Sequence, residues 1–247
     1  MTIIREASEI QKIRDSGQVI KEIFEWLAGA AVDGVSTGAI DRKVEEIIRA
    51  KGGEPAFKGY KGYPASICAS INDVVVHGIP SDSAILKNGD IVSIDVGVKK
   101  NGYFTDAART FAVGEINAEA MELIEVTRAS LSEGIKKAIA GNRVSDISRA
   151  IEKTVRKSGF KEVRSFVGHG TGHNLHEAPE IPNWGVKGEG MVLSEGLVLA
   201  IEPMVNVGTR EIKVLNDGWT AVTRDGKLSA HFEDTVMVGK NKAEALT

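Results

Sequence analysis

The sequence predicts an α+β fold built from two halves that share one plan, a pair of helices followed by an antiparallel hairpin. Each half begins with apolar residues at helical spacing and continues with short alternating segments and turns, which are typical of strands. The halves also keep one spacing, since Gly52 and Gly159 follow helices and Asp95 and Glu202 end apolar strands at the same separation. This repetition favours an internal duplication; the alternative is a chance alignment of two α+β segments.

Four helices are expected, two in each half. In the first, apolar residues from Ile10 to Leu27 recur at helical spacing, and Ser8 beside a glutamate suits its start. Glycines follow the second and fourth helices, and glycine is common just beyond a helix end. The expected ranges are Ser8 to Ala30, Thr37 to Lys51, Ala118 to Ala140 and Ser145 to Ser158. No linker separates the halves, so we expect residues 1–247 to form one domain.

Asn101-Gly102 predicts the hairpin of the first half, because Asn-Gly between alternating segments is the strongest short signal for a two-residue turn. Counting back from this turn pairs Gly97 with Asp106. Asp95 then lies on the same face as Asp106, with roughly 7 Å or less between the two β carbons. Gly97 leaves the space between the acids open. A bulge that turns one acid to solvent is the alternative.

The second half supplies two further acids, Glu202 at the end of the apolar strand 197–201 and Glu233 in the segment 231–238. Four carboxylates about 4 Å apart would repel one another by about 4 kcal/mol per pair at an effective dielectric constant of about 20. The total, on the order of 20 kcal/mol, exceeds the roughly 5–15 kcal/mol that keeps a domain folded. Such a site requires protons or cations, and two divalent ions would cancel the charge and provide a hydrolytic centre.

The histidines favour metal ions over protons. All of them, His77, His169, His173, His176 and His231, lie in segments expected to border the acids, although a structural role is an equal alternative for His173 and His231. One imidazole with four carboxylates suits divalent ions such as Mn, Co, Fe or Zn. Two such ions activate water for hydrolysis of an acyl or phosphoryl bond. A phosphoesterase is disfavoured, because the segments that carry these acids and histidines lack a cluster of arginines or lysines that could hold a phosphate.

Composition and charge restrict the partners and the compartment. The net charge is −3 and no basic stripe stands out, so no nucleic-acid site is indicated. The single cysteine, Cys68, cannot form an intramolecular disulfide, which fits a reducing compartment. Charged side chains interrupt residues 1–20, and no uncharged apolar run is long enough to cross a bilayer. We therefore expect a cytoplasmic protein that does not enter a membrane.

A set of motifs resembles the methionine aminopeptidase and aminopeptidase P superfamily across nearly the whole chain. The motifs are Asn72 to Pro80, Asp95 and Gly97 followed by Thr105-Asp106, Gly168 to Gly172, Ile201 to Pro203 and His231 to Thr235. The resemblance implies the pita-bread fold of creatinases and aminopeptidases. It also implies that two divalent metal ions are held by Asp95, Asp106, His169, Glu202 and Glu233, with Asp106 and Glu233 bridging both ions.

The same resemblance implies how a peptide is held. His77 lies near the scissile nitrogen, and His176 lies near the carbonyl oxygen as it becomes an oxyanion. Glu202 is either a general base as well as a ligand, or a ligand alone. A methionine pocket, with core packing as the alternative for each residue, comprises Phe57, Tyr60, Tyr63, Cys68, Leu175 and Trp219. A backbone site for one Na or K ion comprises Asn72, Val74 and Ser229.

Within this superfamily the chain resembles the type I, bacterial-style group. The Val-His-Gly-Ile-Pro sequence around His77, a length without an extra N-terminal domain or zinc-binding extension, and the lack of a long insertion in the second half favour that group. The implied enzyme is a monomer that acts on N-terminal Met peptides and nascent chains at the ribosome, removing the initiator methionine when the second residue is small.

Two other functions fit the same fold, an Xaa-Pro aminopeptidase or dipeptidase and a catalytically inactive binding protein. The inactive protein would be expected to lose metal ligands, whereas all five positions are filled here. The chain departs from the usual pattern at Val76, where many members carry Cys, at His173, where they carry Arg, and at Leu175, where they carry Phe. These departures bear on the shape of the pocket and on its response to pH, because a histidine titrates near neutrality.

Overall fold

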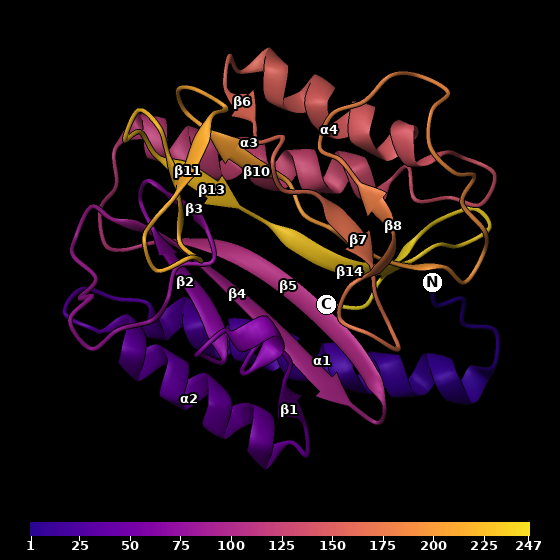
Figure 1. The fold of residues 1–247 in the computed structure, drawn as a ribbon, viewed down its shortest axis with the longest axis horizontal. Helices are drawn as coiled ribbons and strands as arrows, with labels where there is room; N and C mark the ends of the chain where they lie inside the picture. Colours follow the sequence, from indigo (N-terminus) through magenta and orange to yellow (C-terminus); the bar gives the residue numbers. More distant parts are fainter.

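Two pairs of helices lie at opposite ends of the molecule, with the strands between them (Figure 1). The computed structural model describes residues 1–247, and the helices are α1 (Ala7–Ala30), α2 (Thr37–Ala50), α3 (Ala118–Ile135) and α4 (Val144–Lys157). We call residues 1–117 the first half and residues 118–247 the second half. Within each half the two helices contact each other. None of the helices has the length and apolar composition that a membrane span requires.

The glycines end their helices as the sequence predicts, but the start of α1 differs. Gly52 and Gly159 adopt left-handed φ angles of 72° and 85° just beyond α2 and α4, which confirms both stops. Helix α1 matches the expected range to within one residue, but it begins at Ala7 and not at Ser8. Glu6 precedes the first helical residue, and its side chain makes no hydrogen bond to the first turn.

Helix α3 ends at Ile135, short of the expected Ala140. The residues beyond it turn toward the C-terminal segment, where the amide of Ala140 donates a hydrogen bond to the carbonyl of Gly239 at 2.9 Å. Ile139 also forms an isolated bridge with Gly239. These bonds to a distant segment replace the next helical turn, so the periodicity of the sequence overestimates the length of α3.

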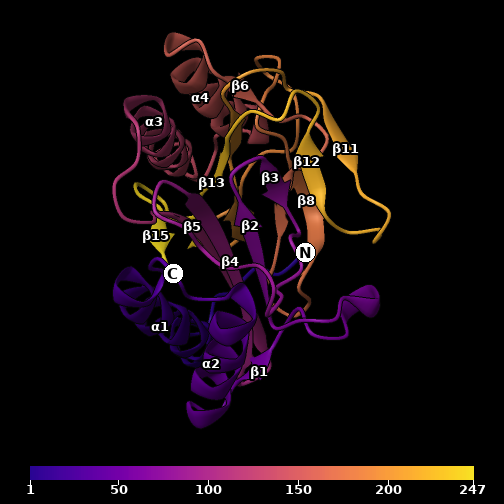
Figure 2. The ribbon, with the colours of Figure 1, turned by 90° about the vertical axis from the view of Figure 1, so that its left-hand side faces the viewer.

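A central sheet of nine strands runs through both halves in the order β1-β4-β5-β14-β9-β7-β8, with β2 paired to β4 and β15 to β14. The strands of the first half are β1 (Glu54–Pro55), β2 (Ile67–Ile71), β3 (Val74–Val76), β4 (Ile91–Lys100) and β5 (Tyr103–Ala112), with a short 3-10 helix at Tyr60–Gly62. Those of the second half are β6 (Lys161–Glu162), β7 (Gly168–Gly170), β8 (Glu177–Ile181), β9 (Val198–Ile201), β10 (Met204–Asn206), β11 (Ile212–Val214), β12 (Ala221–Thr223), β13 (Ser229–His231), β14 (Glu233–Met237) and β15 (Glu244–Ala245). Strands β5 and β14 therefore join the halves. A separate sheet, β11-β12-β3, lies on the side of the molecule away from α1 (Figure 2).

The predicted hairpin is present as β4 and β5. Asn101 and Gly102 both have positive φ angles, of 54° and 85°, as the two-residue turn requires, and Gly97 pairs with Asp106. The second half differs in its connection. Its equivalent strands, β9 and β14, are antiparallel neighbours, but β10 to β13 lie between them in the chain instead of a short turn.

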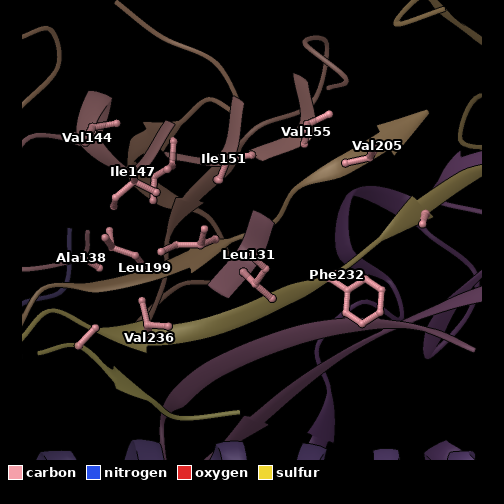
Figure 3. Packing of buried hydrophobic residues seen from close by; sticks show 14 of the residues in the cluster. Leu131, Ala138, Val144, Ile147, Ile151, Val155, Leu199, Val205, Phe232 and Val236 are labelled. Atoms are coloured by element: carbon pink, nitrogen blue, oxygen red, sulfur yellow. The ribbon is translucent and has the colours of Figure 1, made fainter. Parts of the chain in front are cut away.

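Each half has its own apolar core between its helices and its part of the sheet. In the first half Val92, Ile94, Val96 and Val98 of β4 pack with residues of α1 and α2. In the second half Leu199 and Val236 pack with residues of α3 and α4 (Figure 3). Successive side chains of a strand point to opposite faces, so the intervening residues of β4, including Asp95, face away from the helices. The cores thereby decide which face of the sheet carries the acids.

Candidate metal centre

A cavity of about 180 Å³ brings together the acids that the sequence predicts to converge. Its lining residues are Phe57, Tyr60, Lys61, Tyr63, Cys68, His77, Asp95, Asp106, His169, Leu175, His176, Glu202, Trp219 and Glu233. Both halves contribute acids, from β4 and β5 in the first and from β14 and the end of β9 in the second. Asp106 and Glu233 are 2% and 3% exposed, so water does little to screen their charges.

The spacing of the first two acids follows from the hairpin register. Asp106 lies opposite Gly97, and Asp95 lies two residues before Gly97 on β4 and on the same face, as predicted. The space over Gly97 is not open, however. A β carbon on Gly97 would lie 2.5 Å from Cε1 of Phe57, so the Phe57 ring packs directly on this glycine. The ring closes one side of the cavity next to the acids.

Hydrogen bonds between the halves hold Asp106 in place. The hydroxyl of Thr235 on β14 accepts a hydrogen bond from the amide of Asp106 at 3.0 Å, and its oxygen lies 2.8 Å from the Asp106 carbonyl and 3.0 Å from its Oδ1. Glu233 lies two residues before Thr235 on the same strand, where it pairs with Ala108 of β5. The two acids on the adjoining strands are thus fixed by the pairing that joins the halves.

Burial raises the pKa of each acid in the cavity. The pKa of Asp106 rises to about 6, mainly through burial. Burial and the neighbouring carboxylates raise the pKa of Asp95, Glu202 and Glu233 well above the usual range. Oδ1 of Asp95 is buried without a hydrogen-bond partner. A buried carboxylate oxygen without a donor is costly, and a cation would satisfy it.

His169 presents one ring nitrogen to the acids. Its Nδ1 lies 2.9 Å from the carbonyl oxygen of Gly170, an arrangement in which Nδ1 carries the proton and donates. Nε2 then keeps its lone pair and lies 3.5 Å from Oδ2 of Asp106 and 3.6 Å from Oε1 of Glu202. Burial lowers the pKa of His169, so the ring is neutral, the form that binds metals.

Asp106, His169 and Glu233 form a group that could hold a metal ion, since one ligand atom from each lies within 4.8 Å of the others. Asp95 and Glu202 line the same cavity. Carboxylate oxygens and one imidazole nitrogen are the donors that divalent ions such as Mn, Fe, Co or Zn accept. The residues present therefore fit a metal.

Two further histidines line the cavity beside the acids. Nδ1 of His176 lies 2.9 Å from the Tyr60 hydroxyl, the rings of these residues stack at 5.1 Å, and burial lowers the pKa of His176 to about 4. His77 has a positive φ of 59° and makes an edge contact with Phe166 at 5.3 Å. Burial lowers the pKa of His77 as well. Both rings are therefore neutral at pH 7.

The remaining histidines have different surroundings. His173 does not line the cavity; its ring lies 4.9 Å from that of Tyr103, so the expectation that all the histidines border the acids is wrong at this position. His231 is 2% exposed, and its Nε2 lies 3.6 Å from Oε2 of Glu202 without a hydrogen-bond partner. His173 lies in the connection between β7 and β8, whose antiparallel pairing brings His169 and His176 together with their rings 4.3 Å apart.

All the side chains expected to form a methionine pocket line the cavity, namely Phe57, Tyr60, Tyr63, Cys68, Leu175 and Trp219. Tyr63, Cys68 and Trp219 belong to one apolar cluster, in which the rings of Tyr63 and Trp219 meet edge to face at 5.1 Å. The Tyr63 hydroxyl lies within donating distance of the carbonyls of Ile67 and Gly78, at 3.0 and 3.1 Å, which holds the ring in place beside the cavity. Leu175 is 2% exposed.

The segments expected to hold a monovalent ion also meet. The carbonyl of Asn72 accepts a hydrogen bond from the amide of Ser229 at 2.8 Å, and Asn72 has a positive φ of 53°. Ser229 pairs with Asn206, and Oγ of Ser229 and Oδ1 of Asn206 are both buried without a partner. Asn206 is absent from the sequence-based prediction, because no motif marks it.

The sequence also fails to predict two other contacts at the site. The side-chain amide of Asn183 donates to the carbonyl of Glu202 at 3.1 Å and fixes the backbone of that acid. Phe166 packs on His77, as described above. Neither residue lies in a recognisable motif. Thr235, in contrast, belongs to the His231 to Thr235 motif, so the sequence points to its segment but not to its bond with Asp106.

Comparison with known proteins identifies close relatives over the full chain. The sequence matches metallopeptidase family M24 over residues 11–240. It is 50% identical to a methionine aminopeptidase of Clostridium acetobutylicum, over 100% of this chain and 99% of that protein. Identity to the methionine aminopeptidase of Escherichia coli is 40%, over 99% of this chain and 93% of that protein.

The structure also resembles solved structures. It superposes on a crystal structure of methionine aminopeptidase from Thermotoga maritima with a TM-score of 0.97 and 44% identity, covering 100% of this chain and 99% of that chain. The prolidase from Pyrococcus horikoshii has a TM-score of 0.80 at 24% identity, and the match covers 99% of this chain and 63% of that chain. The first comparison supports a close relation and the second a shared fold, and together they confirm the predicted pita-bread fold.

Proposed function

This chain belongs to metallopeptidase family M24, and we propose that it is a type I, bacterial-like methionine aminopeptidase, which removes the N-terminal methionine from peptides and new proteins. One observation carries the proposal, the cavity in which five candidate metal ligands adjoin an apolar pocket. A hydrolytic centre next to a short pocket suits an exopeptidase, because the pocket takes one side chain and the acids lie at the bond that follows it. We expect the reaction to be limited to peptides with a small second residue.

The proposed ligands are Asp95, Asp106, His169, Glu202 and Glu233. The partnerless Oδ1 of Asp95 and the tautomer of His169, which leaves the lone pair of Nε2 free, both favour a bound metal. Asp106 and Glu233 lie on the strands that join the halves, so they would hold the metal between the acids of the first half and those of the second. When bound, divalent ions of the Mn, Co, Fe or Zn type lower the pKa of water and polarise the carbonyl of the peptide.

His176 and His77 supply neutral hydrogen-bond donors to the peptide. When the Tyr60 hydroxyl donates to Nδ1 of His176, the ring proton lies on Nε2, where it can donate to the carbonyl oxygen as negative charge develops. His77, held between Phe166 and Trp219, is proposed to donate to the scissile amide. A neutral ring does not repel the ions, so the lowered pKa values suit both roles.

Glu202 is proposed to accept a proton from the attacking water in addition to binding metal. Glu202 lines the same cavity as the other proposed ligands, so its carboxylate would lie within reach of a water molecule held there, and a carboxylate can serve as a general base. The Asn183 side chain holds the backbone of Glu202, so the carboxylate is presented from a fixed position. A ligand role alone is the alternative.

The methionine side chain is proposed to enter the pocket formed by Phe57, Tyr60, Tyr63, Cys68, Leu175 and Trp219. Aromatic faces and a thiol are polarizable surfaces, and thioether sulfur makes favourable contacts with aromatic rings. Burial raises the pKa of the Cys68 thiol, which keeps this wall of the pocket uncharged. An apolar, uncharged wall discriminates against charged N-terminal residues.

Further features of the resemblance extend the proposal. A Na or K ion near Asn72, Val74 and Ser229 would satisfy the partnerless oxygens of Ser229 and Asn206. The continuous central sheet supports one domain over residues 1–247. We further propose a cytoplasmic monomer that acts on nascent chains at the ribosome, where N-terminal methionines first emerge.

A peptide panel with metal analysis of the same sample tests the function. The purified protein, loaded with Mn²⁺, should release methionine from Met-Ala-Ser and leave Xaa-Pro peptides uncleaved. Asp106→Asn is the matched control, because it removes a ligand charge with almost no change in side-chain volume. Cleavage of Xaa-Pro peptides in preference to Met-Ala-Ser would indicate a proline-directed enzyme, and a protein without metal or turnover would indicate a binding protein of this fold.

A further inference from the structure

Arg109 and Asp234 form an ion pair on the face of the central sheet opposite the cavity. Nη2 of Arg109 donates to Oδ1 of Asp234 at 2.5 Å. The guanidinium lies 5.0 Å from the ring centroid of Phe24 on α1, which places it on the helix side of the sheet. Neither residue lines the cavity. The pair is nevertheless next to the site along the chain, because Asp234 follows Glu233.

The pair lies where the two halves of the molecule meet. Strands β5 and β14 pair through two positions, Glu233 with Ala108 and Asp234 with Ala107. Nη1 of Arg109 donates to the carbonyl of Ala108 on its own strand at 2.9 Å and also to the carbonyl of Glu233 on the other strand. The Arg109 guanidinium thus binds both the backbone of Glu233, a proposed ligand, and the side chain of Asp234, the next residue.

The bonds across this junction are reciprocal. Thr235 of the second half holds the backbone and carboxylate of Asp106, and Arg109 of the first half holds the backbone of Glu233. Asp106 and Glu233 are the two acids placed on the joining strands. Their separation therefore depends on how these strands are held, and metal sites require ligands within about 0.5 Å of the productive geometry.

We infer that Arg109 is a positioning residue for the metal centre, which fixes the separation of Asp106 and Glu233 by clamping β5 to β14 from the opposite face with Asp234. This inference rests on the proposed function, since it requires that the acids bind metal. The positioning role of Arg109 depends on the forked shape of its guanidinium. Lysine keeps the charge but offers a single nitrogen, which cannot match the fork that binds two carbonyls and a carboxylate together.

Metal binding and stability, measured separately, test the inference. Metal-free wild type, Arg109→Gln, Arg109→Lys and Asp234→Asn are titrated with Mn²⁺ by calorimetry, and their melting temperatures are measured in EDTA. Arg128→Gln is the matched control, because Arg128 is an exposed arginine of α3 that lines the same surface groove as Arg109 and Asp234. Loss of a residue that supports ligands typically weakens metal affinity by about 10- to 100-fold.

We expect Arg109→Gln to weaken Mn²⁺ affinity by about tenfold or more, Arg109→Lys to recover part of this loss, and Arg128→Gln to stay within about twofold of wild type. A lower melting temperature with unchanged Mn²⁺ affinity in Arg109→Gln would overturn the inference, because it would show a structural role alone. If Arg109→Gln does not fold, the Mn²⁺ affinity and melting temperature of Asp234→Asn are compared with those of wild type, and the same outcomes decide. Wild-type protein that binds no Mn²⁺ would overturn the proposed function itself, and the inference with it.

Discussion

Replacing Tyr60 with phenylalanine isolates one hydrogen bond at the site. The hydroxyl of Tyr60 lies 2.9 Å from Nδ1 of His176, and the two rings stack at 5.1 Å. Tyr60→Phe removes the hydroxyl and keeps the stacked ring. The remaining ring holds the position of His176, but nothing then selects which nitrogen carries the proton.

The size of the effect follows from the type of bond. A neutral hydrogen bond contributes about 0.5–1.5 kcal/mol, and 1.36 kcal/mol corresponds to a tenfold change in rate. Although its surroundings in the cavity lower its pKa, the His176 residue keeps an exposed surface, so water can replace the hydroxyl in part. We therefore expect kcat/KM for Met-Ala-Ser to fall by about threefold to fivefold.

A double-mutant cycle with His176→Ala distinguishes this reasoning from a simple loss of pocket contacts. Initial rates of methionine release are measured for wild type, both single variants and the double variant at saturating Mn²⁺. In the His176→Ala background the Tyr60→Phe change should have no further effect on kcat/KM, because its only partner is gone. Additive losses, or a Tyr60→Phe enzyme with wild-type kcat/KM, would refute a role of Tyr60 in orienting His176.

Three further predictions concern the acids and the hairpin. Asp106→Ala should reduce methionine release to the level of the buffer blank and remove tight Mn²⁺ binding; wild-type turnover would exclude Asp106 as a ligand. Mn²⁺ affinity should fall by about tenfold as pH is lowered from 7 to 5, since ligands bind metal deprotonated and the pKa of Asp106 is raised to about 6, so that this acid takes up its proton across that range; calorimetry at several pH values that gives a constant affinity would contradict this. Gly97→Ala should destabilise the fold by about 1–3 kcal/mol, because its β carbon would lie 2.5 Å from the Phe57 ring, and thermal unfolding should show a Tm about 2–4 °C lower per kcal/mol. An unchanged Tm together with an unchanged KM would show that Phe57 moves aside at no cost.

Most of the fold and the central acids could be predicted from local patterns. The turn at Asn101-Gly102 fixes the register of β4 and β5, and the register fixes Asp95 and Asp106 on one face. The glycines at Gly52 and Gly159 end helices at equivalent points of the halves. These predictions hold because strand alternation and turn chemistry depend on residues that are close in the sequence.

The parts that sequence reasoning missed are contacts between distant segments. Nothing near Gly97 indicates that Phe57 covers it, and nothing near Ile135 indicates that the following residues turn toward Gly239. His173 points to Tyr103, although it lies between two histidines that line the cavity. In each case the partner is determined by how whole elements pack.

By itself, the sequence determined the residue types, the duplicated plan and the face of the first hairpin that carries acids. Only the tertiary structure decided that Tyr60 contacts His176, that Asn183 holds Glu202 and that Arg109 clamps Glu233 across the junction of the halves. The physical reason is the separation in sequence between the residues that make these contacts. Backbone periodicity orients a side chain relative to its own strand, whereas the partner of that side chain depends on where the apolar cores bring the other half of the chain.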